Sequence, residues 1–440
     1  MNAVPQPRVR PSEWLLAAVV FLLPWQARFL WSSRQLNGAF WEYGSFSLYA
    51  LELVVWACLI FALARLLATR GASAPFFWRR WATPKGAVVA GAAGLVLWSW
   101  FSIAWAQDRS LALQAAFRLT EGVALLIVLA RSSRRGRSLA GQAWALAAAA
   151  QGIVAAAQFF TQQVAGSTWL GVDPQLPSEL GASVIELTDG RWLRAYGTFP
   201  HPNILAGFLV IGILISGEWY LRQYRSAQRI FAVACGMVAS VGLAFALSRA
   251  GIAAAALGLA VWLFSCGARR HSLVPPLRFS LAVGITAATA LTIMWPLVAT
   301  RAVAAARLEV KSTQERGMLL REGALLAREH LWTGTGIGQT TLSSYRRNPG
   351  QPGWAYQPPH NVALVALVEL GVDGVLLLLL LLAGTAFRAV QNPGSAGIGM
   401  VAALVVVAWF DHYLWTLLPG TLMACLALGF ASGDPPSDRG

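Results

Sequence analysis

Charged residues are scarce in this chain of 440 residues, because Asp, Glu, Lys and Arg together make up only 12% of it. That share is about half of what soluble domains carry, so an ordinary soluble globule is excluded. Cysteine is also rare, and no Cys-x-x-Cys or Cys/His metal spacing occurs. The four cysteines all fall in or beside apolar runs: Cys58, Cys235, Cys266 and Cys425. Disulfide-stapled outer loops and a cysteine metal site are therefore not expected.

Several familiar chemistries lack their residues. Glu42 and Asp108 are the only carboxylates in the early outer loops, and no outer loop contains an Asp-x-Asp pair. A metal-dependent glycosyltransferase needs such carboxylates to hold its metal ion, so this class of enzyme is not favoured. The stretch Gly334-Thr-Gly-Ile-Gly338 is not followed by Lys-Ser/Thr, so it is not a phosphate-binding P-loop. It is expected to be a turn that ends a helix. No metal and no other cofactor is predicted.

Long apolar runs are what the sequence has in abundance, since 57% of its residues are hydrophobic. Each run is long enough, at roughly 17 to 25 residues, to cross a ~30 Å hydrocarbon core as a helix. The chain is therefore predicted to be an all-α integral membrane protein with about twelve transmembrane helices. The expected spans are residues 14–30, 46–67, 86–106, 111–131, 138–160, 203–221, 230–248, 250–266, 279–299, 361–387, 397–411 and 415–431.

Short basic loops predict how these helices are oriented, because such loops mark the cytoplasmic side of a membrane. The first span follows Arg8 and Arg10 without a small-residue cleavage site, so it is expected to be a retained anchor rather than a signal peptide. Alternation brings both termini to the cytoplasmic side together with five basic segments: residues 65–85, 131–137, 222–229, 269–278 and Arg388. The domain organisation follows: nine helices in 1–299 with an outer loop near 161–202, a large outer loop at 300–360, three helices in 361–432 and a cytoplasmic tail at 433–440.

Much of the net charge of +15 falls on the outer segments. From residue 310 to 332 the charges recur with helical spacing beside leucines, which predicts an amphipathic helix on the membrane surface. Arg307, Arg321 and Arg328 have a plain alternative role, as part of a solvated face on which they pair with glutamates. Arg194 differs, because it stands immediately before a spanning helix, where an unpaired guanidinium near lipid costs a few kcal/mol. An anionic group is expected to meet it.

Two outer loops end alike, in Pro200-His-Pro-Asn203 and Pro358-Pro-His-Asn361. Each places an asparagine near a helix N-cap, where its side chain can accept a free backbone N–H. Both helix N-termini also direct a positive dipole end outward, which is a general anion site. Arginine, helix N-terminus and histidine together suit a phosphate.

The two histidines in these junctions have different prospects. His201 lies between two prolines, and a capping role competes with substrate binding there. His360 precedes a span that holds Glu369, and a neutral imidazole at that depth can accept a proton as general base. Asp411 can orient an outer imidazole or belong to an ordinary turn. The remaining histidines are weaker candidates: His271, His330 and His412.

Four sequence blocks resemble the O-antigen ligase and O-antigen polymerase superfamily, multi-helix bacterial enzymes with one large periplasmic loop. The blocks cover roughly residues 190–375. They are Arg194-Ala-Tyr-Gly-Thr-Phe-Pro-His-Pro-Asn203, Ser248-Arg-Ala-Gly251, Glu315-Arg316 with His330-Leu-Trp-Thr-Gly-Thr-Gly-Ile-Gly338, and Pro359-His-Asn361 with Glu369-Leu-Gly371.

The resemblance implies transfer of a glycan from an undecaprenyl-pyrophosphate carrier to a lipid A–core hydroxyl at the periplasmic face of the bacterial inner membrane, with membrane lipids but no nucleic acid as partners. His360 would remove the proton of that hydroxyl, while Arg194 and Arg316 would bind the pyrophosphate. Bidentate arginines can stabilise a departing phosphate without a metal ion, and direct attack would invert the anomeric carbon. Further substrate contacts are expected from six residues: Arg191, Arg249, His201, Asn203, Arg321 and Asn361.

Two alternatives stay open. An O-antigen polymerase uses the same donor but takes a second carrier-linked unit as acceptor; the single large late loop and the helix count favour the ligase. A transporter of lipid-linked sugars would spread charges along the membrane midplane. Glu52, Arg118 and Glu121 fit that pattern, although ion pairing between packed helices accounts for Arg118 and Glu121 as well.

Overall fold

The computed structural model describes residues 9–68, 84–188, 190–268, 272–303, 307–392 and 395–433. His271, most of the 65–85 loop and residues 434–440 of the expected tail lie outside these ranges. The helices are α1 (Pro11–Phe21), α2 (Ala50–Ala68), α3 (Pro84–Ser102), α4 (Arg109–Ala130), α5 (Arg134–Thr161), α6 (Pro202–Arg222), α7 (Ser226–Ala246), α8 (Arg249–Ala268), α9 (Val274–Ile293), α10 (Trp295–Val303), α11 (Arg307–Glu329), α12 (Thr340–Arg347), the 3-10 turn η2 (Gly353–Ala355), α13 (Val362–Gln391), α14 (Gly397–Phe410), α15 (Tyr413–Thr416) and α16 (Leu418–Ala431).

Eight of the described helices are long and apolar enough to cross a membrane, by length and composition: α2, α4, α5, α6, α7, α8, α9 and α13. Four shorter apolar helices, α1, α3, α14 and α16, fall on the other expected spans. The mostly helical membrane fold agrees with the prediction, while the number of spans stays a prediction. Residues 230–266 do divide into two helices, because the chain turns at Leu247 with a positive φ of 45°.

The first predicted span is wrong in its second half. Helix α1 ends at Phe21, three residues before Pro24, and an antiparallel hairpin follows, formed by β1 (Arg28–Leu36) and β2 (Ala39–Tyr49). Its turn is Asn37-Gly38, whose positive φ values of 49° and 75° are those of a tight hairpin. A second hairpin, β3 (Val184–Leu187) with β4 (Gly190–Leu193), lies in the outer segment that leads to α6. The described part of the chain before α6 thus contains two strand pairs as well as helices.

Helix α6 forms the centre of the core. Sixteen consecutive residues, from Pro202 to Gly217, are buried on every side, whereas a helix at the edge of a bundle buries only one stripe. It packs against α5, α7, α8 and α14. The N-terminus of α6 is therefore fixed on all sides, and the residues just before it inherit that rigidity.

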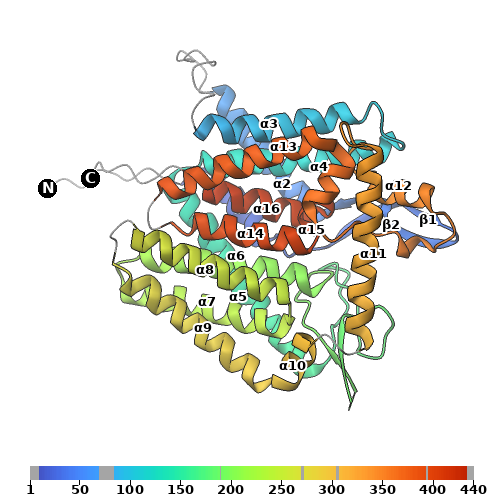
Figure 1. Ribbon diagram of the computed structural model, residues 1–440. Helices are drawn as coiled ribbons and strands as arrows, with labels where there is room; N and C mark the ends of the chain where they lie inside the picture. The colour runs from blue at the N-terminus through green and yellow to red at the C-terminus, as the bar shows by residue number, and fades with distance from the viewer. Residues whose placement is uncertain are drawn as a thin grey trace.

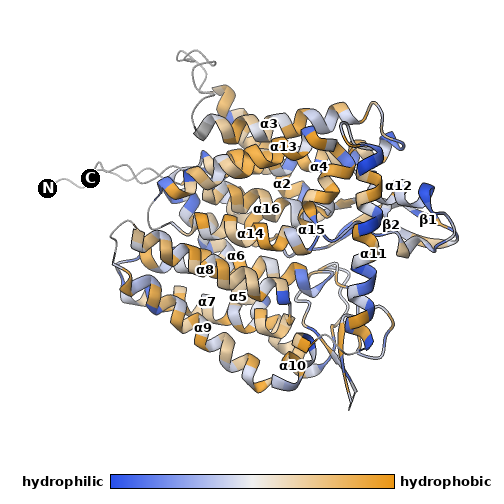
Figure 2. Cartoon of the chain, in the orientation of Figure 1, coloured by the Kyte–Doolittle hydropathy of each residue, from blue (hydrophilic) through white to orange (hydrophobic). Residues whose placement is uncertain are grey.

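The two ends of the bundle differ in character. Arg222 ends α6 and Arg388 lies near the end of α13, whereas His201 and His360 stand immediately before the starts of these helices. Helix α11 runs across the ends of the other helices on the histidine side (Figure 1). Hydrophilic residues gather on α11, while the helices of the bundle are largely hydrophobic (Figure 2). The expected amphipathic helix exists, and it lies across the end where the outer loops meet.

The turn after α11 is locked into a break in α13. Gly371 has φ 66° and ψ −166°, so α13 is interrupted there. The freed carbonyls of Val368 and Glu369 accept the backbone N–H groups of Thr335 and Gly336, at 2.8 and 2.9 Å. This confirms that the Gly334–Gly338 stretch is a turn that follows the helix, and it explains the glycines. A Cβ at Gly371 would lie 1.9 Å from the carbonyl oxygen of Trp332.

We expect Gly371→Ala to destabilise the protein by about 3 kcal/mol, because the conformation is open essentially to glycine alone and the added methyl group clashes. Gly317→Ala is the matched control, since that α11 glycine has nothing within 4 Å of a Cβ and alanine favours a helix. Thermal unfolding in detergent measures both. An unchanged midpoint for Gly371→Ala would contradict the interlocked turn.

Candidate active site

An open cavity of about 1440 Å³ lies at the histidine end of the bundle. Its walls come from segments far apart in the sequence: the β1–β2 hairpin, residues 166–184, the start of α6, α10, α11, the η2 turn and the connection from α14 to α16. Arg194, His201, Arg316 and His360 all line it. Four residues that the sequence singled out separately are thus brought to one cavity.

Arg194 is a buried cation without a carboxylate partner. Its guanidinium is 4% exposed and donates to three neutral oxygens: Ala246 O at 2.9 Å, Ser183 Oγ at 2.8 Å and Asn203 Oδ1 at 2.9 Å. Burial lowers the pKa of Arg194 and the nearby Arg301 lowers it further, yet arginine keeps its proton in proteins. Within the described residues no carboxylate lies within ion-pair distance of it. A buried charge of this kind favours an anionic ligand at the cavity.

Arg316 adds a second available guanidinium from α11. It is half-buried at the cavity wall, and within the described residues it forms no hydrogen bond or ion pair. Arg301, which the sequence did not single out, also lines the cavity and is held by Glu309, whose other oxygen lies 3.4 Å from Arg249. The cavity wall formed by α10, α11 and the segment before α6 therefore carries four cations and two carboxylates: Arg194, Arg301, Lys311, Arg316, Glu309 and Glu315.

His360 pairs with the carboxylate of Asp411. Its Nδ1 lies 3.4 Å from Asp411 Oδ1, and the ring is about one-fifth exposed toward the cavity. Burial alone would raise the pKa of the Asp411 carboxyl, but the bond from His360 and the charges of the His412 and His360 rings outweigh it and hold that pKa below its usual range. An ionised Asp411 fixes the Nδ1–H tautomer of His360 and leaves Nε2 free to accept a proton.

Asn203 joins the arginine to this pair. The sequence predicted that it caps α6, but the cap is His201, whose Nδ1 accepts the N–H of Asn203 at 3.1 Å. The Asn203 side chain instead accepts from Arg194 and from Ser248 Oγ at 3.1 Å, and donates to Asp411 Oδ2 at 2.8 Å. A single amide therefore links the buried guanidinium to the carboxylate that holds the catalytic candidate.

The other two histidines of the cavity are held neutral. Burial, aided by Arg194, lowers the pKa of His201 to about 3. Burial lowers the pKa of His412 to about 4, against the attraction of Asp411. The His412 ring stacks at a tilt on His360, with centroids 4.9 Å apart, and its Nδ1 lies 2.8 Å from Thr416 Oγ1.

His360, Asp411 and His412 also present three ligand atoms within 4.8 Å of one another, an arrangement that can hold a metal ion. Both oxygens of Asp411 already accept hydrogen bonds, Oδ1 from the His412 N–H at 2.8 Å and Oδ2 from Asn203. The two carboxylate oxygens of this cluster thus have protein donors. The expectation of a metal-independent site stays a prediction.

The remaining predicted contacts lie outside the cavity wall. Arg191 donates to the Glu179 carbonyl at 3.3 Å, and Arg249 donates to the Arg301 carbonyl at 3.0 Å. Arg321 is exposed on α11. Asn361 caps α13 as predicted, accepting the Leu364 N–H at 2.9 Å. These four residues are not among those that line the cavity.

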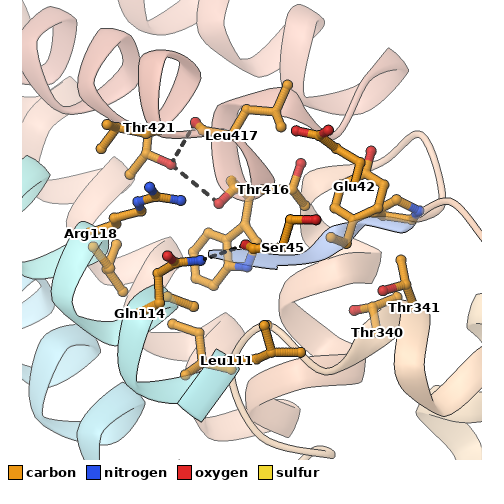
Figure 3. A pocket seen from close by; sticks show the side chains of 18 of the residues that line it. Glu42, Ser45, Leu111, Gln114, Arg118, Thr340, Thr341, Thr416, Leu417 and Thr421 are labelled. Carbon is orange, nitrogen blue, oxygen red and sulfur yellow. Dashed lines mark hydrogen bonds between the residues drawn. The ribbon is translucent and has the colours of Figure 1, made fainter. Parts of the chain in front are cut away.

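A small polar chamber of about 100 Å³ adjoins the cavity (Figure 3). Arg28, Glu42 and Tyr43 line both spaces. On the bundle side, Arg118 does not pair with Glu121: its Nε lies 3.3 Å from Glu52, while Glu121 accepts the indole N–H of Trp56. These intramembrane charges bond between neighbouring helices.

Asp411 is the site residue that the sequence undervalued, and its place after a span, beside His412, was the available signal.

The pKa of His412 predicts how stability depends on pH. Below about pH 6.5 an unfolded histidine takes up a proton that the folded His412 refuses until about pH 4, so stability falls across that window by about 2 kcal/mol at pH 5. We expect His412→Gln to remove this part of the loss between pH 7.5 and pH 5. His330→Gln, a change at an exposed histidine, is expected to keep it. Unfolding midpoints at the two pH values measure the difference, and full pH dependence in His412→Gln would refute the assignment.

Comparison with known families gives one match. Residues 234–379, a segment that contains Ser248, Arg316, the Gly334–Gly338 turn and His360, match the family described as O-Antigen ligase. Arg194 lies before the matched segment. No curated protein matches the chain. Over these residues the match confirms the resemblance to the O-antigen ligase and O-antigen polymerase superfamily that the four sequence blocks predict.

Proposed function

We propose that this protein is an O-antigen ligase, which transfers O-antigen polysaccharide from undecaprenyl pyrophosphate to a hydroxyl of the lipid A–core during lipopolysaccharide synthesis. One observation carries the proposal: Arg194, Arg316 and the His360–Asp411 pair line a single cavity at one end of the membrane bundle. A cationic wall beside a carboxylate-supported imidazole suits a diphosphate leaving group and an alcohol nucleophile.

The proposed step is a single displacement. His360 Nε2 takes the proton of the acceptor hydroxyl as that oxygen attacks the anomeric carbon of the donor sugar. The bond between this carbon and the diphosphate oxygen breaks, and undecaprenyl pyrophosphate leaves with the electron pair. Attack from the face opposite the leaving group inverts the anomeric carbon. Asp411 holds the ring and stabilises the imidazolium that forms.

The arginines supply the electrostatic part. Negative charge grows on the departing diphosphate, and guanidinium groups fixed at the cavity wall, such as the buried Arg194, can stabilise it. Arg194 is suited to this because its three hydrogen bonds fix its geometry before substrate arrives. Bidentate contact from Arg194 and Arg316 can thus replace the divalent ion that many glycosyltransferases use.

The arginine-rich ends of the helices indicate which side of the membrane the cavity faces. Residues 131–137 precede and start α5, Arg222 ends α6 and Arg388 lies near the end of α13, all away from the cavity. If those ends face the cytoplasm, as basic loops do, the cavity faces the periplasm. The protein is then a multi-pass protein of the bacterial inner membrane with both termini in the cytoplasm.

Replacement of the proposed base is expected to remove the chemical step while substrates still bind. For His360→Ala we expect kcat to fall by about 10³-fold, the usual worth of a positioned base. Asp411→Asn is expected to lower kcat by about 10²-fold with little change in KM, because the ring loses its orientation rather than its place. Transfer between purified carrier-linked glycan and lipid A–core measures both.

His330→Ala is the control for these variants, since His330 is exposed and outside the cavity. Wild-type turnover by His360→Ala would remove the imidazole from the mechanism. A rise in KM alone for Asp411→Asn would reassign that carboxylate to substrate binding.

The lipopolysaccharide of cells that lack the protein separates ligase from polymerase. If it is the ligase, the cells make core without O-antigen while carrier-linked polymer still accumulates. A core that bears a single repeat unit identifies a polymerase instead. Expression of the wild-type chain, but not of His360→Ala, is expected to restore the ladder of long chains on a gel.

A further inference from the structure

The walls of the cavity differ in charge. The cations at Arg194, Arg301, Lys311 and Arg316 come from the segment before α6, from α10 and from the first half of α11. The β1–β2 hairpin and η2 contribute aromatic and neutralised residues to the same cavity. In Figure 1 α10 lies beside the start of α11, whereas β2 and α12 lie toward its end. His360 and His412 adjoin the hairpin wall, because the ring of Tyr43 on β2 lies 6.1 Å from that of His412, which in turn contacts His360.

Glu42 on β2 presents a fixed carboxylate to the cavity. Both of its oxygens pair with Arg28 of β1, the second at 3.1 Å. The side chain is nevertheless 37% exposed. Because Arg28 is neutralised by this pair, the hairpin wall has little attraction for a diphosphate. A held carboxylate with free lone pairs accepts hydroxyl groups well.

Trp354 lies in a segment that is clamped to the same hairpin. Gly353 sits so close to β2 that a Cβ there would be 2.5 Å from the Ala39 carbonyl oxygen. Asn37 donates to the Gln351 carbonyl at 2.7 Å, and the Tyr356 hydroxyl donates to the Asn348 carbonyl at 2.8 Å. The Trp354 ring is still 68% exposed, and it lines the cavity. A rigid backbone therefore holds a large aromatic face open to whatever enters.

We propose that Glu42 and Trp354 form the subsite for the acceptor sugar, the hydroxyl-bearing terminal residue of the lipid A–core. This inference rests on the proposed function. A pyranose ring offers hydroxyls to a carboxylate and an apolar C–H face to an aromatic ring, and these two side chains supply both partners. The cationic wall takes the diphosphate of the donor.

Inversion at the anomeric carbon explains why the acceptor uses this wall. The attacking hydroxyl approaches the face opposite the leaving diphosphate, so the two substrates enter from different sides of the base. With the diphosphate on Arg194 and Arg316, the hairpin is the wall that adjoins the base, because Tyr43 on β2 faces the His412 ring and that ring contacts His360. Trp354 and His360 line the same cavity, so a sugar stacked on the indole occupies the space that the imidazole faces.

Equilibrium binding of two purified probes tests the proposal: rough lipopolysaccharide, which is lipid A–core without O-antigen, and undecaprenyl pyrophosphate. We expect Glu42→Gln and Trp354→Ala to raise the Kd for rough lipopolysaccharide about tenfold and to leave the Kd for undecaprenyl pyrophosphate within twofold. Trp354→Phe, which keeps a ring, is expected to recover part of the affinity. Unchanged Kd values for rough lipopolysaccharide, or an equal loss for both probes, would overturn it.

Matched controls come from outside the cavity. Glu329 pairs with Arg347 and is 49% exposed, and Trp332 is 70% exposed. Glu329→Gln and Trp332→Ala are therefore expected to bind both probes like the wild type. If the control variants also lose affinity, the probes bind the exposed surface non-specifically and the proposed subsite is rejected.

The kinetic readout separates this inference from the proposed function. In the transfer reaction Glu42→Gln and Trp354→Ala should raise the KM for the acceptor and leave the KM for the donor unchanged. Absence of transfer by the wild-type protein would reject the ligase, while the binding pattern would still decide where the sugar sits. Selective loss of donor affinity in these variants would place the donor on the hairpin and contradict the assignment.

Discussion

A guanidinium buried without a carboxylate is the constraint around which the cavity end of this protein is organised. Arg194 costs free energy where it lies, and its three neutral hydrogen-bond acceptors offset only part of that cost. Those acceptors come from the end of α7, the β3–β4 segment and the start of α6. The same Asn203 that accepts from Arg194 also donates to Asp411, which orients His360. Charge for an anion and geometry for a base are thus set by one connected network.

Two rigid parts of the fold, helix α6 and the break in α13, hold that network in place. Helix α6 is buried all round, so the segment that carries Arg194 and His201 cannot shift independently. On the other side, the break at Gly371 lets α13 accept the turn after α11 into its own backbone. This contact fixes α11, and with it Arg316, relative to His360 at the start of α13. Two sequence blocks that look unrelated, Gly334–Gly338 and Glu369–Gly371, therefore lie side by side and share backbone hydrogen bonds.

Much of this could be predicted from composition and periodicity, because long apolar runs leave a membrane helix as their main option. The amphipathic α11 followed from the spacing of its charges, whereas the family resemblance is what grouped Arg194, Arg316 and His360. The β1–β2 hairpin could not be seen that way, since its two ends, residues 28–30 and 46–49, are apolar enough to extend the spans expected at 14–30 and 46–67. Only Pro24 and the Asn37-Gly38 turn signalled it. Asp411 was undervalued because a carboxylate at a helix turn has many ordinary roles, and its contact with His360 spans 51 residues of sequence.

The central claim is that guanidinium groups, not a metal ion, stabilise the leaving diphosphate. The most direct test is the initial rate of glycan transfer by purified protein in EDTA, for the wild type, Arg316→Ala and Arg316→Lys. The account predicts full wild-type turnover in EDTA, a large loss for Arg316→Ala and only partial recovery with lysine, which lacks the bidentate fork. Turnover that EDTA abolishes and an added divalent cation restores would contradict it.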